Sequence, residues 1–441
     1  MEAAVREAAS EEQRGECAPE EACAPECAGL LDELPREFVE FLKTNGVPLE
    51  AYNLSGQQTA QPPRYVRVNP RGALALAHPS GPARRAAVAD ALHLSAEVSC
   101  VRWLPHSTVP WAEVYACAAS TSLSQCDAYR SGSLYGIDAA SVFAACCLDP
   151  KPGDAVLDLC CAPGAKLCAL CDAVQPDGEV IGVDIAEQRL AACRTVLKKY
   201  GISNARLSLG SGTSWDPSEA QWLDLDPPRG RGQRGRKRRF AAAAAAAAGC
   251  AGDGRSGAEE SQMAAAADSG GPPPGPALFD RVLVDAECTH DGSIRHIEKY
   301  RTQWGWDTLG ERVPWVRQDG LYDLQAALLT NGFRLLRAGG TLVYSTCSLC
   351  RRQNEDVVAE FLEREPAAVL TPLPEYLYLP AEAARASGEV ASAPARPSLL
   401  ESQRPLGKGA RYCTARFDPS SSGTSGLFIA CITRRPLPTS K

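Results

Sequence analysis

From about residue 131 onward, short apolar segments alternate with segments of helical periodicity, and this alternation constrains the fold more than any other feature of the chain. The clearest helices are predicted for Gly320 to Arg337 and Gln353 to Glu365. The predicted strands are AVLDLC (Ala155 to Cys160), EVIGVDI (Glu179 to Ile185), RLSLG (Arg206 to Gly210), RVLVDA (Arg281 to Ala286) and GTLVYST (Gly340 to Thr346). Such alternation predicts an α/β fold in which helices cover both faces of a parallel sheet.

Two further strand-like segments follow close together, Arg411 to Phe417 and Gly426 to Arg434. Their short separation predicts an antiparallel hairpin at the edge of the sheet. That ending differs from a dinucleotide-binding fold and is typical of a methyltransferase sheet.

The chain divides into three parts by composition. Residues 1–28 are rich in Glu, Ala and Pro without apolar periodicity, which predicts a disordered acidic tail. Residues 29–130 combine one helical pattern with the strand-like RYVRVNP segment (Arg64 to Pro70), which predicts a small separate region. Residues 131–441 form the α/β domain, with low-complexity insertions predicted at about 229–277 and 381–397.

Composition narrows the class of protein. No apolar run among the 441 residues approaches the roughly 20 needed to cross a bilayer, and the acidic N-terminus lacks a hydrophobic signal core. We therefore expect a soluble, intracellular protein whose 19 cysteines are mostly reduced packing residues. A net charge of -7 argues against non-specific nucleic-acid binding by the whole chain.

One basic run, Arg229 to Arg239, stands against that acidic background. It fits an RNA-tracking tail, a nuclear-localisation patch or a solvated linker. We favour a nuclear or nucleolar location, with the cytoplasm as the alternative.

A cofactor site is predicted where VLDLCCAPGAK (Val156 to Lys166) joins a strand, a Pro-Gly turn and a helix start. The strand delivers Asp158, and the next strand delivers Asp184 where a carboxylate can accept the hydroxyls of a ribose. The turn has no run of phosphate-cradling glycines, which favours a nucleoside without a pyrophosphate. S-adenosylmethionine fits these requirements, and capping of the following helices is the alternative role for both carboxylates.

Two cysteines end two other predicted strands, Cys288 in VDAEC and Cys347 in YSTCS. Carboxyl ends of strands are where open α/β sheets hold their ligands, so a thiol nucleophile is predicted there. The pairs Cys347-x-x-Cys350 and Cys168-x-x-Cys171 could each be half of a zinc or redox site. One lies at a strand end and the other within a helix, so we predict no metal.

The segments DLCCAPGAK, VDAEC and YSTCSL followed by QNEDVV, in this order and spacing, resemble the Sun-type RNA (cytosine-5)-methyltransferase family. The resemblance covers roughly residues 60–434 apart from the insertions. It implies a class I methyltransferase fold, Rossmann-like, with a mostly parallel seven-stranded sheet. It also implies a small N-terminal α+β RNA-binding region, which RYVRVNPRG and LYGIDAAS (Leu134 to Ser141) match in outline.

The resemblance further implies an enzyme that forms 5-methylcytosine in tRNA or ribosomal RNA from S-adenosylmethionine. RNA is the implied partner, no membrane is expected, and a monomer is the default. Cys347 takes the role of the nucleophile that attacks C6, and Cys288 that of the thiol that resolves the covalent adduct. Asp285, if protonated, could donate to N3 of cytosine. The implied cofactor-binding residues are Cys160, Cys161, Ala162, Pro163, Gly164, Ala165, Lys166, Asp184, Arg189, Ser211 and Asp285.

The chain departs from the family pattern at several positions. Ser211 stands where the family has an acidic residue beside the adenine, so either a weaker adenine contact or a substitute contact from Asp216 is expected. Glu287 replaces a proline before Cys288 and is expected to raise the pKa of that thiol. The family's ENE motif, which follows the YSTCS segment, is here Gln353-Asn354-Glu355 (QNE), a milder change.

THDGSIRH (Thr289 to His296) also differs from the family, leaving His290 and Asp291 as candidate substrate or proton-shuttle residues. For His290 we favour a surface loop position. Ser211 and Glu287 motivate a second hypothesis, an RNA-binding factor in ribosome or tRNA maturation that keeps the fold with weak or no turnover.

Overall fold

The computed structural model describes residues 33–52, 63–79, 81–92, 98–101, 104, 109–223, 279–309, 318–374, 377 and 413–436. The predicted acidic tail, the basic run and both low-complexity insertions lie outside these residues. Within the described ranges, no helix combines the length and the apolar character that a bilayer crossing requires.

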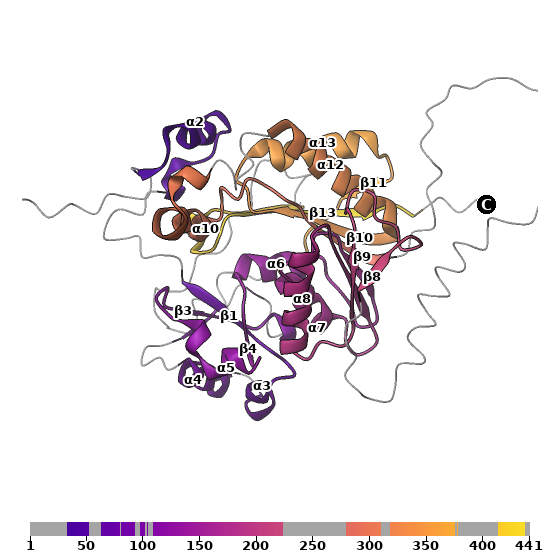
Figure 1. Ribbon diagram of the computed structural model, residues 1–441. Coiled ribbons are helices and arrows are strands. Elements are labelled where there is room, and N and C mark those ends of the chain that lie inside the picture. The colour runs from indigo at the N-terminus through magenta and orange to yellow at the C-terminus, as the bar shows by residue number, and fades with distance from the viewer. Residues whose placement is uncertain are drawn as a thin grey trace, which may run out of the picture.

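A nine-stranded sheet forms the centre of the molecule (Figure 1). Its order is β11-β13-β10-β9-β5-β6-β7-β8, and β12 also pairs with β13. The strands are β5 (Ala155–Asp158), β6 (Glu179–Asp184), β7 (Ala205–Leu209), β8 (Gln221–Leu223), β9 (Phe279–Asp285), β10 (Leu336–Thr346), β11 (Ala368–Leu370), β12 (Thr414–Phe417) and β13 (Leu427–Arg434). β7, β6, β5, β9 and β10 run parallel, which confirms the predicted α/β fold with a mostly parallel sheet.

The sheet differs from the prediction at its two ends. Seven strands were expected, and the structure adds the three-residue strands β8 and β11, both antiparallel to their neighbours. The C-terminal pair is antiparallel, as predicted. Its second strand, β13, is not at the edge, because it pairs with β10 on one side and with β11 and β12 on the other.

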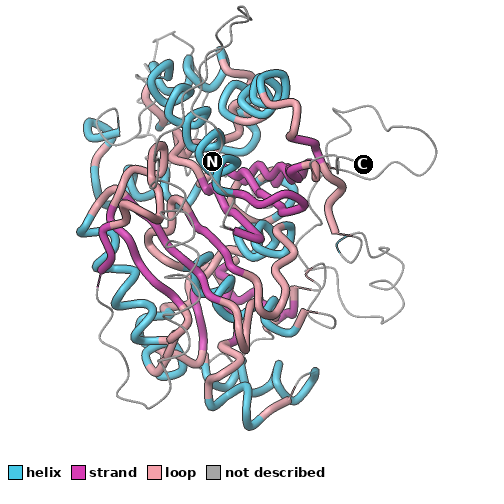
Figure 2. The backbone as a smooth tube through the Cα atoms, turned by 90° about the vertical axis from the view of Figure 1, so that its right-hand side faces the viewer, coloured by secondary structure: helices cyan, strands magenta, loops and turns pink. Residues whose placement is uncertain are grey.

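Helices cover both faces of this sheet, as Figure 1 and the side view in Figure 2 show. The helices on one face are α6 (Ala139–Cys147), α7 (Ala165–Ala173) and α8 (Glu187–Lys199), and those on the other are α12 (Gln318–Leu335) and α13 (Glu355–Arg364). Cys146, Cys147, Cys168 and Cys171 are buried in the core beneath the first set. These four cysteines therefore contribute to core packing.

A second, antiparallel sheet of order β2-β3-β1-β4 lies beside the α7 face. Its strands are β1 (Arg64–Val68), β2 (Ser99–Cys100), β3 (Val114–Cys117) and β4 (Leu134–Gly136), and the helices near it are α3 (Ala73–Ala77), α4 (Gly81–Ala91) and α5 (Asp127–Arg130). The predicted boundary at residue 131 thus precedes the last strand of this sheet. Arg67 of β1 donates to Asp172 of α7 at 2.7 Å with both side chains fully buried, which ties the two sheets together.

The N-terminal helix does not join the small sheet. Phe38 of α2 (Arg36–Thr44) and Tyr52 of η1 (Leu49–Tyr52) pack against Ile297 and Tyr300. The elements that receive them are α10 (Ile294–Lys299), η4 (Tyr300–Trp304) and η5 (Trp306–Thr308). The remaining short helices are η2 (Pro110–Ala112), η3 (Leu123–Gln125), η7 (Arg351–Gln353) and α15 (Pro419–Ser422). Residues 29–130 therefore contribute to three hydrophobic clusters, one of which they share with the helices α6, α7 and α8.

Candidate active site

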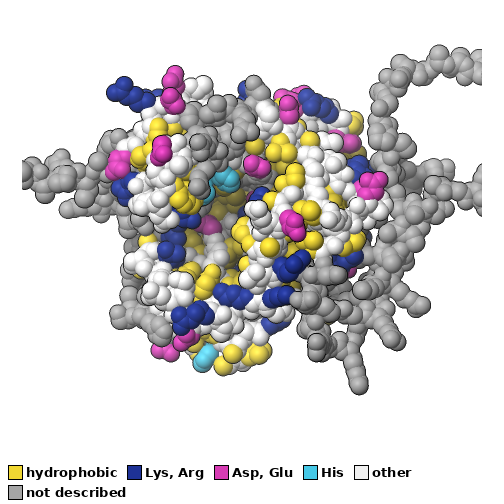
Figure 3. Space-filling view, in the orientation of Figure 1, with side chains coloured by type: hydrophobic (Ala, Val, Ile, Leu, Met, Phe, Trp, Pro, Cys, Tyr) yellow, Lys and Arg dark blue, Asp and Glu magenta, His cyan; other side chains and the backbone are white. Residues whose placement is uncertain are grey.

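A cavity of about 590 Å³ lies at the carboxyl ends of the central strands and opens as the hollow in the middle of Figure 3. β5 is the strand at which the order of the sheet reverses, because its neighbours β6 and β9 are reached in opposite directions. Ligands of open α/β sheets bind at this switch point. The sequence motifs that follow β5, β6, β9 and β10 all reach this cavity.

The turn after β5 forms one wall of the cavity. Gly164 caps α7 with a φ of +105°, a left-handed conformation that glycine adopts readily. The predicted cofactor residues that line the cavity are Cys160, Ala162, Pro163, Lys166, Asp184, Arg189, Ser211 and Asp285. Cys161 faces the interior instead, with its Sγ 4.0 Å from the Sγ of Cys193, and Gly164 and Ala165 contribute backbone geometry to the turn.

Asp184 ends β6 and joins two parts of this wall. One carboxylate oxygen accepts from the backbone N–H of Ala186 at 3.0 Å, and the other faces the Ala162 N–H at 3.4 Å. Arg189 lies 3.4 Å from the same carboxylate and donates to the Ala162 carbonyl at 3.0 Å. Asp184 thus holds the turn before α8, whose N-cap is Ala186, and also lines the cavity; the predicted helix cap is not formed by its side chain.

The neighbouring Ile185 lines the cavity with 68% of its surface exposed. The exposed Ile185 side chain provides an apolar contact surface next to the Asp184 carboxylate, a hydrogen-bond acceptor. Leu159 and Leu328 extend the apolar surface. This combination suits a nucleoside, which presents an aromatic base face and sugar hydroxyls.

Ser211 lies on the same wall, and its hydroxyl is 2.8 Å from that of Thr213. The expected substitute contact from Asp216 is wrong. Its carboxylate accepts from Arg334 at 3.0 Å and from Ser218, and it is not among the residues that line the cavity. The ion pair with α12 holds Asp216 away from the ligand position.

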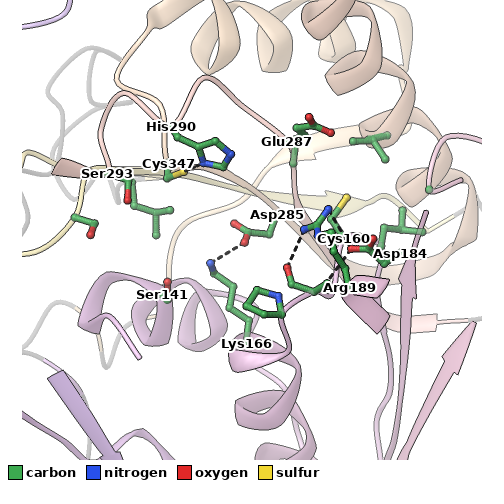
Figure 4. A pocket seen from close by; sticks show the side chains of 18 of the residues that line it. Ser141, Cys160, Lys166, Asp184, Arg189, Asp285, Glu287, His290, Ser293 and Cys347 are labelled. Carbon is green, nitrogen blue, oxygen red and sulfur yellow. Dashed lines mark hydrogen bonds and ion pairs between the residues drawn. The ribbon is translucent and has the colours of Figure 1, made fainter. Parts of the chain in front are cut away.

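Asp285 and Lys166 face one another across the cavity floor (Figure 4). Lys166 donates to one carboxylate oxygen at 2.7 Å, and Ser345 of the adjacent strand donates to the other at 2.7 Å. Both oxygens of Asp285 therefore act as acceptors. The expected donation from a protonated Asp285 would require the loss of at least one of these contacts.

Asp158 lies beneath this pair and is almost fully buried. Burial, and then the negative charge of Asp285, raise the pKa of Asp158 to about 8. Its Oδ1 has no hydrogen-bond partner among the described residues. The end of β5 therefore holds a carboxylate oxygen that the described part of the chain leaves without a hydrogen-bond partner.

The two predicted thiols meet at the opposite wall. The Sγ atoms of Cys288 and Cys347 are 3.2 Å apart. Cys347 lines the cavity, whereas Cys288 is completely buried behind it. The pKa of Cys288 is raised well above its usual value by burial and by Cys347, so the expectation that Glu287 raises it is wrong in its cause. Glu287 lines the cavity instead.

His290 is not a surface loop residue. Its ring lines the cavity, with Nδ1 2.9 Å from the Sγ of Cys347 and 3.8 Å from that of Cys288. Its signal in the sequence is its position two residues after Cys288 within a motif loop. Asp291, by contrast, is fully buried, accepts from the backbone N–H of Leu349 at 2.7 Å and from the Thr289 hydroxyl, and is therefore a structural residue.

The QNE motif lies behind the thiols and fixes both of their loops. Gln353 accepts from the backbone N–H of Thr289 at 3.1 Å, which holds the loop of Cys288. Asn354 accepts from the Thr346 hydroxyl at 2.6 Å and donates to the Ser348 carbonyl at 2.9 Å, which holds the loop of Cys347. Gln353, which replaces the glutamate of the family's ENE motif, therefore still positions the loop that carries Cys288.

Cys288, His290 and Cys347 are the group of potential metal ligands found among the described residues, with their ligand atoms within 4.8 Å of one another. A structural zinc needs four such ligands, and this group offers three. Cys350, which would join Cys347 in the alternative zinc or redox pair, directs its thiol at Asn45 at 3.2 Å. We therefore interpret the group as a pair of thiols around one imidazole.

The family model described as 16S rRNA methyltransferase RsmB/F matches residues 145–226 and 257–433, more than half of the chain. The chain belongs to the RsmB/F methyltransferase family. Ribosomal RNA small subunit methyltransferase B of Salmonella paratyphi A is 29% identical to it over 238 residues. That match covers 53% of this chain and 39% of the Salmonella protein, so the chain matches about two fifths of the length of its curated relatives.

Solved structures agree with the RsmB/F assignment at the level of the fold. The crystal structure of PH0851 matches with a TM-score of 0.56 and 21% identity, over 94% of this chain and 70% of that one. A methyltransferase homolog protein from Pyrococcus horikoshii matches with a TM-score of 0.50 and 22% identity, over 91% and 100%. The fold is that of a class I methyltransferase, as predicted.

Proposed function

We propose that this RsmB/F family member is an S-adenosylmethionine-dependent RNA methyltransferase that forms 5-methylcytosine through a covalent bond between Cys347 and C6 of the base. The observation that carries the proposal is the convergence of a cavity-facing thiol and a carboxylate, Cys347 and Asp285, opposite a nucleoside-shaped wall. Ribosomal RNA is the substrate that the family description favours, and tRNA is the alternative.

The residues of the first wall fit S-adenosylmethionine. Asp184 would accept from the ribose hydroxyls, and the exposed Ile185 would cover one face of the adenine. When bound, the cofactor supplies an electrophilic methyl group.

The role of Cys347 would be to make C5 of cytosine nucleophilic. C5 of cytosine is a poor nucleophile, and bond formation between the Cys347 sulfur and C6 shifts the C5–C6 electron pair to C5. C5 then takes the methyl group. Loss of the C5 proton restores the double bond and expels the thiolate. Cys288, with its sulfur 3.2 Å behind that of Cys347, is placed to assist this release.

Asp285 would orient the base. Because both of its oxygens accept hydrogen bonds from Lys166 and Ser345, it fits the exocyclic amino group of cytosine, which is a donor. Such a contact distinguishes cytosine from uracil, which has a carbonyl at that position.

A second cavity, of about 740 Å³, supports an RNA path toward this site. It lies between β1 of the small sheet and α10, and it shares Asp138, Ser293 and Ser425 with the first cavity. Arg64, Arg295 and Lys299 line it together with Tyr65 and Tyr129. Cationic and aromatic side chains along one groove suit a single-stranded polynucleotide, so residues 63–136 are proposed as an RNA-binding region.

The test is transfer of labelled methyl groups from S-adenosylmethionine to cytosine-containing RNA. Labelling of cytosine C5 by the unmodified protein, together with its loss in Cys347→Ala, would support the proposal. Cys288→Ala should trap an RNA adduct that survives a denaturing gel. Normal turnover in Cys288→Ala would remove Cys288 from the mechanism and leave the role of Cys347 intact.

The second candidate function is an RNA-binding factor with little or no turnover. Ser211 and Glu287, both lining the cavity in place of the family's residues, favour it. A protein that binds RNA and never labels it would support this candidate. Placement in the nucleus or nucleolus is a separate hypothesis that depends on the basic run. Unchanged localisation after deletion of residues 229–277 would refute it.

A further inference from the structure

His290 is the ionisable group of the cavity to which the proposed mechanism gives no part. We propose that His290 is the proton acceptor of Cys347, so that this chain carries a cysteine–histidine dyad as its nucleophile. The inference rests on the proposed function for the identity of the substrate. The reactivity that it assigns to Cys347 belongs to the protein alone and can be measured without RNA.

The contact geometry is that of a thiol hydrogen bond. Nδ1 of His290 lies 2.9 Å from the Sγ of Cys347 and is nearer to it than to the Sγ of Cys288, at 3.8 Å. Nucleophilic thiols are activated by a base within hydrogen-bonding reach. Cys347 is also the thiol that lines the cavity, so the activated sulfur is the one that a base can approach.

The backbone holds the imidazole in this position. His290 has a φ of +55°, in the left-handed region that residues with a side chain seldom adopt. Two hydrogen bonds close the turn, from the Gly292 N–H to the Cys347 carbonyl and from the Ser293 N–H to the His290 carbonyl, both at 2.9 Å. The first of them links the histidine loop directly to the cysteine. Such locally strained residues cluster at functional sites.

The charges around the pair favour a protonated imidazole. The pKa of His290 is raised to about 9 chiefly by Cys288, against burial, with smaller contributions from Asp291 and Glu287. His296 of α10 packs near the ring, with the centroids 5.4 Å apart. Lys166 approaches from α7, and its pKa is raised, against burial, chiefly by Asp285 and to a smaller extent by Cys347. A proton leaving Cys347 would be held by His290, and the resulting imidazolium and the Lys166 ammonium would both stabilise the thiolate.

Cys160 provides the contrast within the same cavity. It also lines the wall, and no histidine contact is found for it among the described residues. Burial and the negative charges of Asp158 and Asp285 raise its pKa well above the usual value. Cys160 and Cys347 thus follow two parallel strands, β5 and β10, that are separated by β9, and the histidine distinguishes the reactive cysteine from the inert one.

The proton transfer is balanced without any further reactant. The Cys347 S–H bond breaks and its proton moves to Nδ1 of His290, giving an imidazolium and a thiolate. The thiolate forms the bond to C6. After the methylated base is released, the thiolate takes the same proton back or remains paired with the imidazolium for the next cycle.

The test is the rate at which iodoacetamide alkylates Cys347 across pH, resolved by peptide mass mapping on chelator-treated protein without RNA or cofactor. In the unmodified protein, Cys347 should react at about pH 6, whereas Cys160 should stay unmodified until alkaline pH. His290→Gln should lower the rate at Cys347 by about 10- to 50-fold at pH 6 to 7 and leave it nearly unchanged at pH 10. His78→Gln, at a histidine that lines neither cavity, is the matched control and should keep the original profile.

A second variant shows whether a loss of reactivity comes from the missing imidazole or from misfolding. His290→Gly suits the left-handed backbone and leaves room for free imidazole, which should restore alkylation of Cys347 at neutral pH. Identical pH profiles in the unmodified protein and His290→Gln, or no rescue by imidazole in a folded His290→Gly, would overturn the dyad. Low-pH alkylation without any labelling of RNA would instead uphold the dyad and refute the proposed function. Methyl transfer to RNA by a protein whose Cys347 alkylates only at alkaline pH would uphold the proposed function and refute the dyad.

Discussion

The cavity has two walls made from equivalent parts of the sheet, and they differ in chemistry. The wall after β5 and β6 carries Cys160 and Asp184, and the wall after β9 and β10 carries Asp285 and Cys347. Each wall pairs a carboxylate with a thiol at strand ends. The first surrounds its thiol with negative charge, and the second places an imidazole and an ammonium near its thiol. Position on the sheet therefore provides access, and contacts between loops decide reactivity.

The largest expected effect separates the two thiols. Cys347→Ser should reduce methyl transfer to RNA by several orders of magnitude, because the hydroxyl cannot replace the thiolate as nucleophile. Cys160→Ser should retain most of the activity. Single-turnover label transfer measures both, and equal losses in the two variants would contradict the division between the walls. Binding of S-adenosylmethionine to Cys347→Ser, followed by calorimetry, should be unchanged.

The next effect tests β5, the strand of the first wall that pairs with β9 of the second wall. Asp158 at the end of β5 has a folded pKa of about 8, above its unfolded value near 4, so the folded protein holds this proton more tightly. The stabilising contribution is complete below about pH 4 and is lost as the pH rises to 8. That loss lowers the free energy of unfolding by roughly 2–5 kcal/mol.

Urea denaturation between pH 5 and pH 8.5 measures this dependence. Asp158→Asn, which has the same shape and does not ionise, should remove most of the slope. A slope that survives in Asp158→Asn would assign the pH dependence to other groups. Asp154, on the amino-terminal side of β5 and paired with Arg281 at 2.9 Å, gives a control position on the same strand.

A smaller effect is expected for binding at the first wall alone. Asp184→Asn keeps the size of the side chain and weakens its hydrogen bonds to ribose hydroxyls. The affinity for S-adenosylmethionine should fall about 10- to 100-fold, which corresponds to about 1.4–2.8 kcal/mol. Alkylation of Cys347 should be unaffected. If the thiol loses reactivity together with the cofactor affinity, the walls are coupled and the comparison fails.

The smallest effect concerns the residue that departs from the family on this wall. Ser211→Asp places a carboxylate where the Ser211 hydroxyl contacts Thr213 and should raise cofactor affinity by about 2- to 5-fold through one added hydrogen bond. Ser211→Ala serves as its control and should change affinity by less. A decrease in Ser211→Asp would mean that Ser211 does not face the adenine.

Much of the fold was predictable because it depends on local periodicity. The five parallel strands and the helices α12 and α13 were placed within a few residues, since runs of buried apolar residues determine them. The short strands β8 and β11 were missed because three residues carry no periodic signal. The position of β13 inside the sheet was also missed, because strand order depends on pairings between distant segments.

The sequence by itself determined which residues could do chemistry: two thiols, three carboxylates and a Pro-Gly turn stand where strands end, because strand ends are local features. Only the tertiary structure decided how they act. It turned Cys161 inward, bound Asp216 to Arg334, and brought His290 to within 2.9 Å of Cys347, 57 residues away along the chain. Contacts between separate loops depend on packing, and the reactivity of a thiol depends on those contacts, so sequence spacing could not reveal them.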